Sequence, residues 1–355
     1  MVLRYGVIGT GMMGVEHIHN LLHVDGTEIT ALADPHPASI EAAAALVPDA
    51  AVFADHTALL AAGVCDAVVV ASPNMTHIDV LSDVLATDLH VLVEKPLCTT
   101  VDDCYTVLDL AEGREAITWV GLEYRYIPQI TRLIDEVDAG AVGQPRMVAI
   151  REHRFPFLRK VGDWNRFSRN TGGTLVEKTC HFFDLMCRIM PSRPVRVMAS
   201  GGQDVNHLDE EYDGEVPDIL DNAFVIVEFA DGGRGMLDLC MFAEATHDQE
   251  QLSVVGELGK VETYVPHALV RIGRRGEHWM GNVETHEVHD DSVAYEGFHD
   301  GSSYLEHLHF RDAIREGREP EVTLHDGLVS VAIGAAAHRS IDEGRVVELS
   351  EFLRG

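Results

Sequence analysis

Lysine is nearly absent from the sequence. Only four of its 27 basic residues are lysine, against 58 acidic residues, and the formal net charge is −31. This excess of negative charge argues against nucleic acids and anionic membranes as partners. Repulsion among so many like charges is screened in concentrated salt, where the Debye length falls to about 3 Å at 1 M. We therefore expect a halophilic protein, inactivated by low salt, in which the few remaining lysines are needed where they stand.

Long apolar runs and paired cysteines are also missing. No window approaches the roughly 18–20 unbroken apolar residues of a membrane span, and the first residues, MVLRYGVIG, are typical of a buried strand rather than a signal peptide. The six cysteines form no C-x-x-C pair, and no cysteine or histidine spacing fits a zinc site. We expect a cytoplasmic protein without disulfides, a bound metal or a membrane partner.

Residues 1–124 predict a doubly wound α/β domain. Near-continuous apolar strands alternate there with helical patterns, which is typical of a parallel sheet covered on both faces. Sheets of this kind bind ligands at the carboxyl ends of their strands. The predicted strands are residues 3–9, 29–34, 68–72, 90–94 and 118–123, and the predicted helices are residues 12–22, 38–46, 76–86 and 100–112.

Residues 125–355 predict an α+β domain with a mostly antiparallel sheet. Extended stretches from about residue 194 are joined by short turns such as ADGG (230–233) and GELG (256–259), and the tail returns to helix within 303–343. The strand NAFVIVEFA is apolar on both faces, so helices on one face leave the other in need of a second cover. We therefore expect a homo-oligomer, a dimer or a tetramer, packed through this sheet.

The motif GTGMMG follows the first predicted strand and opens the first predicted helix. In that context Gly9 permits a tight turn, Gly11 lets the backbone approach a pyrophosphate, and Gly14 allows close helix packing. Met12 and Met13 begin the helix, whose N-terminus faces phosphates with the positive end of its dipole. The motif predicts a dinucleotide cofactor.

Asp34 ends the second predicted strand, twenty residues after Gly14. A carboxylate at this point suits the two hydroxyls of an adenosine ribose and repels a 2′-phosphate. The following Pro35 and His36 provide no arginine to neutralise such a phosphate. The sequence therefore favours NAD as the cofactor, and NADP stays open.

Two further motifs carry titratable groups. VLVEKPL places Glu94 and Lys95 at the end of a predicted strand, where ligands bind; the alternative is a lysine exposed on a loop. GGTLVEKTCHFFDL (172–185) reads as one helix, with Glu177 and His181 four apart on one face. Histidine takes up a proton at neutral pH, and a nearby ammonium stabilises a developing alkoxide. The alternative is a buried histidine that only satisfies its helix neighbours.

The sequence resembles the Gfo/Idh/MocA oxidoreductases over essentially its whole length. The resemblance implies a Rossmann domain followed by a domain with an open-faced sheet. It also implies a dehydrogenase that acts on a sugar or a polyol. The motifs that carry it are GTGMMG, ASPNMTH (71–77), EKP (94–96), GLEYRY (121–126), GGTLVEKTCHFFDL and DAIREGREPEVTLHDGL (312–328).

Residue by residue, the resemblance makes Lys95 the catalytic lysine. It puts Glu177 and His181 in place of the usual Asp-x-x-x-His pair, and the longer side chain of Glu177 leaves the role of that carboxylate open. The cofactor contacts that we predict are Gly9, Gly11, Met12, Met13, Gly14, Asp34, Ser72, Asn74, His77, Glu94 and Lys95, with Ser72, Asn74 and His77 beside the ribose–nicotinamide half.

The WNR motif before the glycine pair is our first prediction for substrate binding. Trp164 offers an aromatic plate and Asn165 an amide, which suit a polyhydroxylated ring; the alternative is a loop anchored by a packed tryptophan. We also expect Arg125 and His153 near the substrate at the domain boundary, together with His181.

These patterns predict an NAD(P)-dependent dehydrogenase that oxidises one secondary hydroxyl of a cyclic polyol or sugar, inositol-like substrates included. If the same residues catalyse the reverse reaction, the protein is a reductase of a keto-sugar or of another carbonyl or imine substrate. A tightly bound cofactor recycled between two sugars is a further alternative. A non-catalytic dinucleotide-sensing regulator would not need Lys95 and His181.

Overall fold

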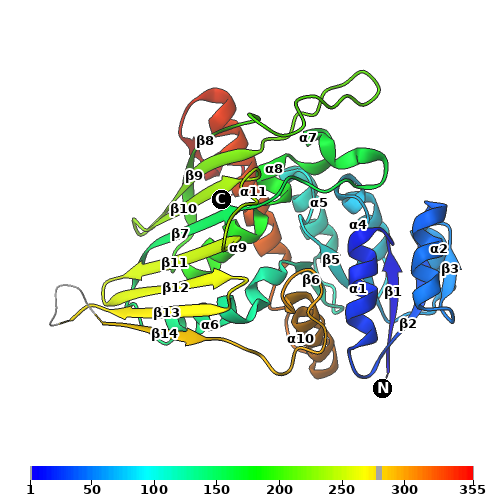
Figure 1. Ribbon diagram of the computed structural model, residues 1–355. Coiled ribbons are helices and arrows are strands. Elements are labelled where there is room, and N and C mark those ends of the chain that lie inside the picture. The colour runs from blue at the N-terminus through cyan, green and yellow to red at the C-terminus, as the bar shows by residue number, and fades with distance from the viewer. Residues whose placement is uncertain (1, 277–281, 355) are drawn as a thin grey trace.

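The computed structural model describes residues 2–276 and 282–354 and builds them around two sheets (Figure 1). The first sheet has six parallel strands in the order β3-β2-β1-β4-β5-β6. The strand order reverses between β1 and β4, which is the switch point where such sheets bind ligands. Its strands are β1 (Leu3–Ile8), β2 (Thr27–Ala33), β3 (Ala51–Phe53), β4 (Ala67–Val70), β5 (His90–Glu94) and β6 (Thr118–Gly121).

Helices pack against both faces of this sheet, and every residue of β4 and β6 is buried. The predicted α/β class and parallel sheet are confirmed. The short β3 and α3 were not predicted, because three to seven residues give too little pattern. The covering helices are α1 (Met12–Leu22), α2 (Pro37–Leu46), α3 (His56–Ala62), α4 (His77–Leu85) and α5 (Val101–Ala111), with a 3-10 turn η1 (Asn74–Thr76) before α4.

The second sheet has nine strands in the order β14-β13-β12-β11-β7-β10-β9-β8-β15. All neighbours are antiparallel except β7 and β10, which run parallel. This confirms the predicted mostly antiparallel sheet. Its strands are β7 (Pro145–His153), β8 (Pro194–Gly202), β9 (Asn222–Phe229), β10 (Arg234–Cys240), β11 (Glu250–Gly256), β12 (Gly259–Val265), β13 (Leu269–Arg274), β14 (Asn282–Glu287) and β15 (Val347–Glu348).

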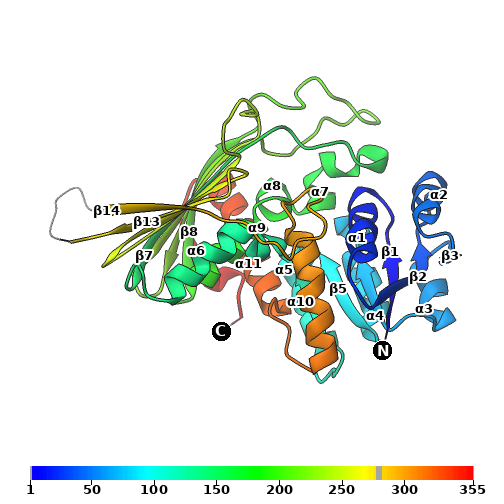
Figure 2. The ribbon, with the colours of Figure 1, turned by 60° about the horizontal axis from the view of Figure 1, so that its bottom comes forward.

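Helices lie against one face of the second sheet, as Figure 2 shows from its edge. In β9 the side chains alternate accordingly: Val225 and Val227 are buried under the helices, whereas Phe224 on the other face is 63% exposed. The remaining helical elements are α6 (Pro128–Asp138), α7 (Ser168–Thr171), α8 (Thr174–Glu177), α9 (Cys180–Ile189), α10 (Ser302–Glu316), α11 (Leu324–Glu343), η2 (Glu123–Tyr126), η3 (Val161–Arg166) and η4 (Leu349–Glu351).

The two long C-terminal helices link the sheets. α11 packs against β6 and α5 on one side and against α9 and β8 on the other, and α10 packs against α1 and η2. The carboxyl ends of β5 and β6 are thereby held close to α8 and α9. Across the described residues, every helix is too short or too polar to cross a membrane.

The prediction of one helix through the 172–185 segment is wrong. α8 ends at Glu177 and α9 begins three residues later. In a continuous helix the Glu177 carbonyl would accept a hydrogen bond from the backbone N–H of His181. In the structure the Lys95 ammonium donates to that carbonyl at 3.2 Å instead. The break therefore lets the end of β5 bond the backbone of Glu177, four residues before His181.

Candidate active site

The glycine turn joins the end of β1 to the start of α1. Gly9 has a φ of +87°, and a Cβ on it would lie 2.5 Å from the backbone nitrogen of Ser72. A Cβ on Gly14 would lie 2.0 Å from the carbonyl oxygen of Gly9. A Cβ on Gly11 would meet no atom within 4 Å. Two of the glycines thus serve protein packing, and Gly11 faces open space at the helix N-terminus, as a cofactor pyrophosphate requires.

Asp34 follows β2 and is tied to the glycine turn. Its Oδ2 accepts hydrogen bonds from the backbone nitrogen of Thr10 at 2.7 Å and from the Thr10 hydroxyl at 3.2 Å. Its Oδ1 accepts from the backbone nitrogen of His36 at 2.7 Å. The carboxylate is therefore fixed beside the turn, where its charge disfavours a ribose 2′-phosphate. Met12 is exposed and Met13 half-buried on the first turn of α1.

His77 braces the loops that follow β4 and β5. Its ring is fully buried, with Nδ1 at 2.9 Å from the carbonyl of Pro96 and Nε2 at 3.0 Å from the carbonyl of Ser72. Both ring nitrogens thus face backbone, and neither is left for a ligand. Asn74 is buried nearby, and its side-chain Nδ2 has no hydrogen-bond partner among the described residues.

Lys95 stands at the carboxyl end of β5, with its ammonium on the backbone of α8. Burial alone would lower the pKa of Lys95, but the Cys180 thiol and the Glu94, Glu123 and Glu177 carboxyls outweigh it and raise that pKa above its usual value. The side chain is therefore a cation throughout the neutral range.

His181 lies on the first turn of α9 and is 2% exposed. Its ring stacks on Tyr124 of η2, with centroids 4.2 Å apart and planes 10° apart. Burial, followed by the charges of Lys95 and Lys178, lowers the pKa of His181 well below its usual value. The imidazole is therefore neutral and free to accept a proton.

Glu177 lies among three of the four lysines, and the charges of Lys95, Lys160 and Lys178 all act on its carboxyl group. The carboxyl is 7% exposed, and its Oε2 has no hydrogen-bond partner among the described residues. Burial raises the pKa of Glu177, against the opposing charges of Lys95 and Lys160. The fourth lysine, Lys260, stands apart in an ion pair with Glu262 at 2.6 Å. That the lysines of this group are needed for activity stays a prediction.

Sequence reasoning missed the polar network beneath His181. The Lys178 ammonium donates to the Tyr124 hydroxyl at 3.0 Å and pairs with Glu152 at 2.9 Å. Tyr124 in turn donates to Glu250 at 3.4 Å. A signal was available, because Glu152 follows Val148 and Ile150 at every second position of β7, on the face that the helices cover.

The prediction that His153 binds substrate is wrong because side chains alternate between the two faces of β7. His153 is the next residue of β7, so its side chain points to the opposite, open face of the sheet. There its Nε2 lies 3.2 Å from Oδ1 of Asp238. Among the described residues, the side chain of His153 pairs with Asp238 and not with Lys95 or His181.

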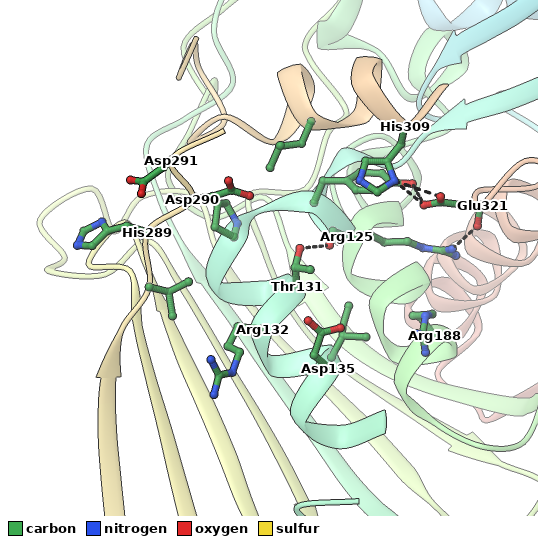
Figure 3. Close-up of a pocket in the computed structure, with 15 residues that line it drawn as sticks. Arg125, Thr131, Arg132, Asp135, Arg188, His289, Asp290, Asp291, His309 and Glu321 are labelled. Atoms are coloured by element: carbon green, nitrogen blue, oxygen red, sulfur yellow. Dashed lines mark hydrogen bonds and ion pairs between the residues drawn. The ribbon is translucent and has the colours of Figure 1, made fainter. Parts of the chain in front are cut away.

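Arg125 is also not a free substrate contact. Its Nε donates to Oδ2 of Asp184 at 2.7 Å, and its Nη1 donates to the carbonyl of Glu321 at 2.9 Å. These bonds hold η2 to α9. Arg125 lines a pocket of about 590 Å³ beside α6, in which its guanidinium turns toward Glu321 (Figure 3). Lys95 and His181 are not among the residues that line this pocket.

The WNR motif forms η3, and its contacts fit a loop anchor. Asn165 is fully buried, and its Nδ2 donates to the carbonyl of Leu158 at 2.9 Å. Trp164 is half-buried, and its backbone carbonyl accepts from Asn170 at 2.9 Å. The structure thus ties the loop before η3 to η3 itself.

One group of described residues has the composition of a metal site, namely His247, Asp248 and His267. The two imidazoles stack with planes 5° apart and centroids 3.9 Å apart. Because a metal lies in the plane of each imidazole that binds it, parallel rings in this stack cannot share one ion. No residue of the group belongs to the cluster around Lys95.

Two family comparisons match nearly the whole chain. "Oxidoreductase family, NAD-binding Rossmann fold" matches residues 3–122, and "Oxidoreductase family, C-terminal alpha/beta domain" matches residues 134–349. Among curated proteins, myo-inositol 2-dehydrogenase of Thermotoga maritima is 28% identical over 99% of this chain and 100% of its own. The scyllo-inositol 2-dehydrogenase (NAD(+)) of Bacillus subtilis is 24% identical over 98% of this chain and 96% of its own.

Solved structures share the fold at lower identity. An oxidoreductase domain protein from Kribbella flavida superposes with a TM-score of 0.86 at 22% identity, over 98% of this chain and all of its own. Levoglucosan dehydrogenase in complex with NADH and levoglucosan superposes with a TM-score of 0.83 at 18% identity, over 98% of this chain and 99% of its own.

Proposed function

This chain belongs to the Gfo/Idh/MocA oxidoreductase family, and on that premise we propose that it is an NAD-dependent dehydrogenase that oxidises a secondary hydroxyl of a cyclic polyol or sugar. The observation that carries the proposal is the position of the Lys95 ammonium on the backbone four residues before His181. The Lys95 ammonium, at the tip of β5, bonds the carbonyl that ends α8, and its charge acts on the neutral imidazole of His181.

The chemistry divides between cofactor and protein. NAD, when bound, supplies the acceptor for the hydride. His181 is neutral and buried, so it accepts the proton of the substrate hydroxyl. Lys95 is a fixed cation and stabilises the negative charge that develops on the substrate oxygen. Glu177, with one free carboxyl oxygen, binds a neighbouring hydroxyl or orients the imidazole.

The residues around the switch point form the proposed cofactor site. Gly11 leaves space for the pyrophosphate at the start of α1, and Asp34 faces the adenosine ribose, which favours NAD over NADP. His77 contributes by bracing the loops. The other residues that we assign to this site are Gly9, Met12, Met13, Gly14, Ser72, Asn74, Glu94 and Lys95.

Unpaired buried polar atoms support a polyol or sugar as the substrate. They include Oε2 of Glu177, Oε2 of Glu152 and Nε of Arg154, none of which has a hydrogen-bond partner among the described residues. Each hydroxyl of a polyol both donates and accepts, so a ring that carries several can satisfy such a mixed set.

A substrate panel tests the function. Inositols, aldoses and sugar acids are supplied with NAD or NADP in molar salt, and the absorbance of reduced nicotinamide is followed. Turnover of at least one cyclic polyol or sugar, faster with NAD, is the expected result. The matching keto compounds with NADH test the reductase alternative. Tight NAD binding without turnover of any compound would instead support a dinucleotide-sensing regulator.

The open face of the second sheet supports association with another copy of the chain. Phe224, Ile226, Met236 and Met147 are exposed on neighbouring strands of that face. An apolar area of this kind on a soluble protein marks an interface. Light scattering after size exclusion should give a dimer or a tetramer, and Phe224→Glu should shift the mass toward the monomer.

Composition supports a halophilic protein that works in the cytoplasm, and both stay predictions. Molar salt screens the net charge of −31 and should be required for activity. Full activity and an unchanged Tm in dilute buffer would contradict the halophilic character.

A further inference from the structure

Glu123 is a buried carboxyl group that the proposed function does not use. It opens η2 directly after β6, and only 3% of it is exposed. Its Oε2 lies 3.7 Å from Nδ1 of His181, and its Oε1 lies 3.8 Å from Nδ1 of His299. Neither Oε1 of Glu123 nor Nδ1 of His181 has a hydrogen-bond partner among the described residues. The carboxyl group thus stands between two imidazoles and is held by neither.

The two imidazoles differ in their access to solvent. His181 is almost completely buried, and Tyr124 covers one face of its ring. The side chain of His299, which precedes α10, is 24% exposed. A proton that His181 accepts from a substrate must leave the site before the next turnover. The line from His181 through Glu123 to His299 leads toward the surface.

A neighbouring carboxyl group sets the charge of Glu123. Burial alone would raise the pKa of Glu94, but the hydrogen bond from His17 at 2.9 Å and the charges of His17 and Lys95 lower that pKa to about 2. Burial, followed by the negative charge of Glu94, raises the pKa of Glu123 to about 8. At neutral pH one carboxyl is therefore ionised and the other carries a proton. Two neighbouring titratable groups whose pKa values are shifted in opposite directions are typical of an acid and a base in catalysis.

The groups that face Glu123 come from every element packed around it. The ammonium groups of Lys95 and Lys178 oppose the effect of Glu94 on its pKa. Among the described residues these groups are Glu94 and Lys95 at the end of β5, Tyr124 on η2, Lys178, Cys180 and His181 at the junction of α8 and α9, His299 before α10, and Glu306 on α10.

Resting on the proposed dehydrogenase function, we propose that Glu123 relays the proton released at His181 to His299. Nδ1 of His181 gives its proton to Oε2 of Glu123, while Oε1 of Glu123 gives its own proton to Nδ1 of His299. His299 then loses a proton to solvent from its other nitrogen. The electron pair of the broken C–H bond leaves with the hydride, so only a proton is transferred from His181 through Glu123 to His299. Glu123 acts through His181 and does not contact the substrate.

The electrostatics suit this role. A group that passes protons works best when its pKa lies near the working pH, as that of Glu123 does. Burial lowers the pKa of His299 to about 3, so His299 does not retain the proton that it receives. The distances of 3.7 and 3.8 Å are longer than hydrogen bonds, and catalytic contacts of this kind tighten when ligands bind.

Glu123→Gln is the direct test, because glutamine keeps the size and the hydrogen-bonding shape but cannot take up and release a proton. Turnover should fall by about 10²-fold, the typical scale for a lost acid–base group, while KM and NAD affinity stay unchanged. The ionisation near pH 8 in the kcat profile of the wild type should disappear. Glu123→Asp keeps the carboxyl group and should restore part of the turnover.

Glu306→Gln is the matched control. Glu306 is another buried carboxyl; it accepts a hydrogen bond from Trp119 at 3.2 Å and does not lie between the two histidines. Its variant should keep the wild-type pH profile. Turnover and a pH profile of Glu123→Gln equal to those of the wild type would overturn the relay. An equal loss in both variants would do the same, because it would show a general effect of buried charge.

Infrared spectroscopy tests the protonation of Glu123 without turnover. The spectrum of the ligand-free wild type minus that of Glu123→Gln should show the carbonyl stretch of a protonated carboxyl group at neutral pH, and this difference band should titrate away near pH 8. The subtraction removes the bands of other buried carboxyls whose pKa is raised, such as Glu306. Absence of the band would overturn the relay even in an active enzyme. If the wild type oxidises no compound of the panel, the proposed function fails and the relay falls with it, whatever the band shows.

Discussion

Replacing Gly11 with alanine tests whether this glycine is needed for NAD binding rather than for folding. A Cβ there meets no atom within 4 Å, and the backbone, with φ −69° and ψ −160°, is one that alanine adopts. The free energy of unfolding of Gly11→Ala should stay within about 0.5 kcal/mol of the wild type. The new methyl group would stand where the pyrophosphate approaches the N-terminus of α1. Losing one hydrogen bond to a charged phosphate costs about 1.5–3 kcal/mol, or roughly 10–150-fold in the Kd of NAD.

Gly14→Ala is the matched control with a different expected outcome. Its Cβ would lie 2.0 Å from the carbonyl oxygen of Gly9, so α1 must shift, and overpacking of this kind costs about 1–3 kcal/mol of stability. Urea unfolding measures the stability of both variants, and fluorescence titration at the same salt concentration measures NAD binding. Wild-type NAD affinity in Gly11→Ala, or a loss of stability equal to that of Gly14→Ala, would refute the reasoning.

Three further predictions concern catalysis, packing and pH. Lys95→Ala and His181→Ala should each lower turnover by about 10²-fold or more with NAD affinity retained, and normal turnover of His181→Ala would remove the assigned base. Arg125→Leu leaves the buried carboxylate of Asp184 without its partner and should lower the free energy of unfolding by about 3–5 kcal/mol. Arg132→Leu breaks the exposed ion pair with Glu136 and should lower it by less than about 1 kcal/mol. Equal urea midpoints of the two variants would contradict this prediction. The pKa of Glu123 rises from 4.5 to about 8 on folding, so its contribution to stability is complete below 4.5 and is lost as the pH rises through 8. Between those values the Tm of the wild type should fall more steeply with pH than that of Glu123→Gln, and parallel curves would count against the buried neutral carboxyl.

The parallel sheet and the glycine turn could be predicted because their signals are local. A strand buried on both faces is a continuous apolar run, and β4 and β6 are buried at every residue. Helices with clear flanking signals were also placed well. The helix predicted over residues 100–112 corresponds to α5, and the helical tail predicted within residues 303–343 corresponds to α10 and α11.

Much of the site could not be predicted, because it depends on contacts between distant parts of the chain. The helix that the local pattern favours is interrupted at Glu177, whose carbonyl accepts a hydrogen bond from the Lys95 ammonium 82 residues away. Arg125 finds its carboxylate partner 59 residues away, so its sequence position gave no sign that its charge is already satisfied. The position of Glu123 between two histidines arises only when η2, α9 and the segment before α10 meet.

Deuterium transfer tests the central claim most directly. Myo-inositol, or whichever polyol the panel identifies, is labelled with deuterium at the reacting ring carbon and oxidised by the wild type with NAD in molar salt. NMR of the recovered cofactor should show one deuterium at the nicotinamide ring for each turnover, while His181→Ala should transfer the label far more slowly. Label released to water instead, with none in the cofactor, would contradict hydride transfer in this site.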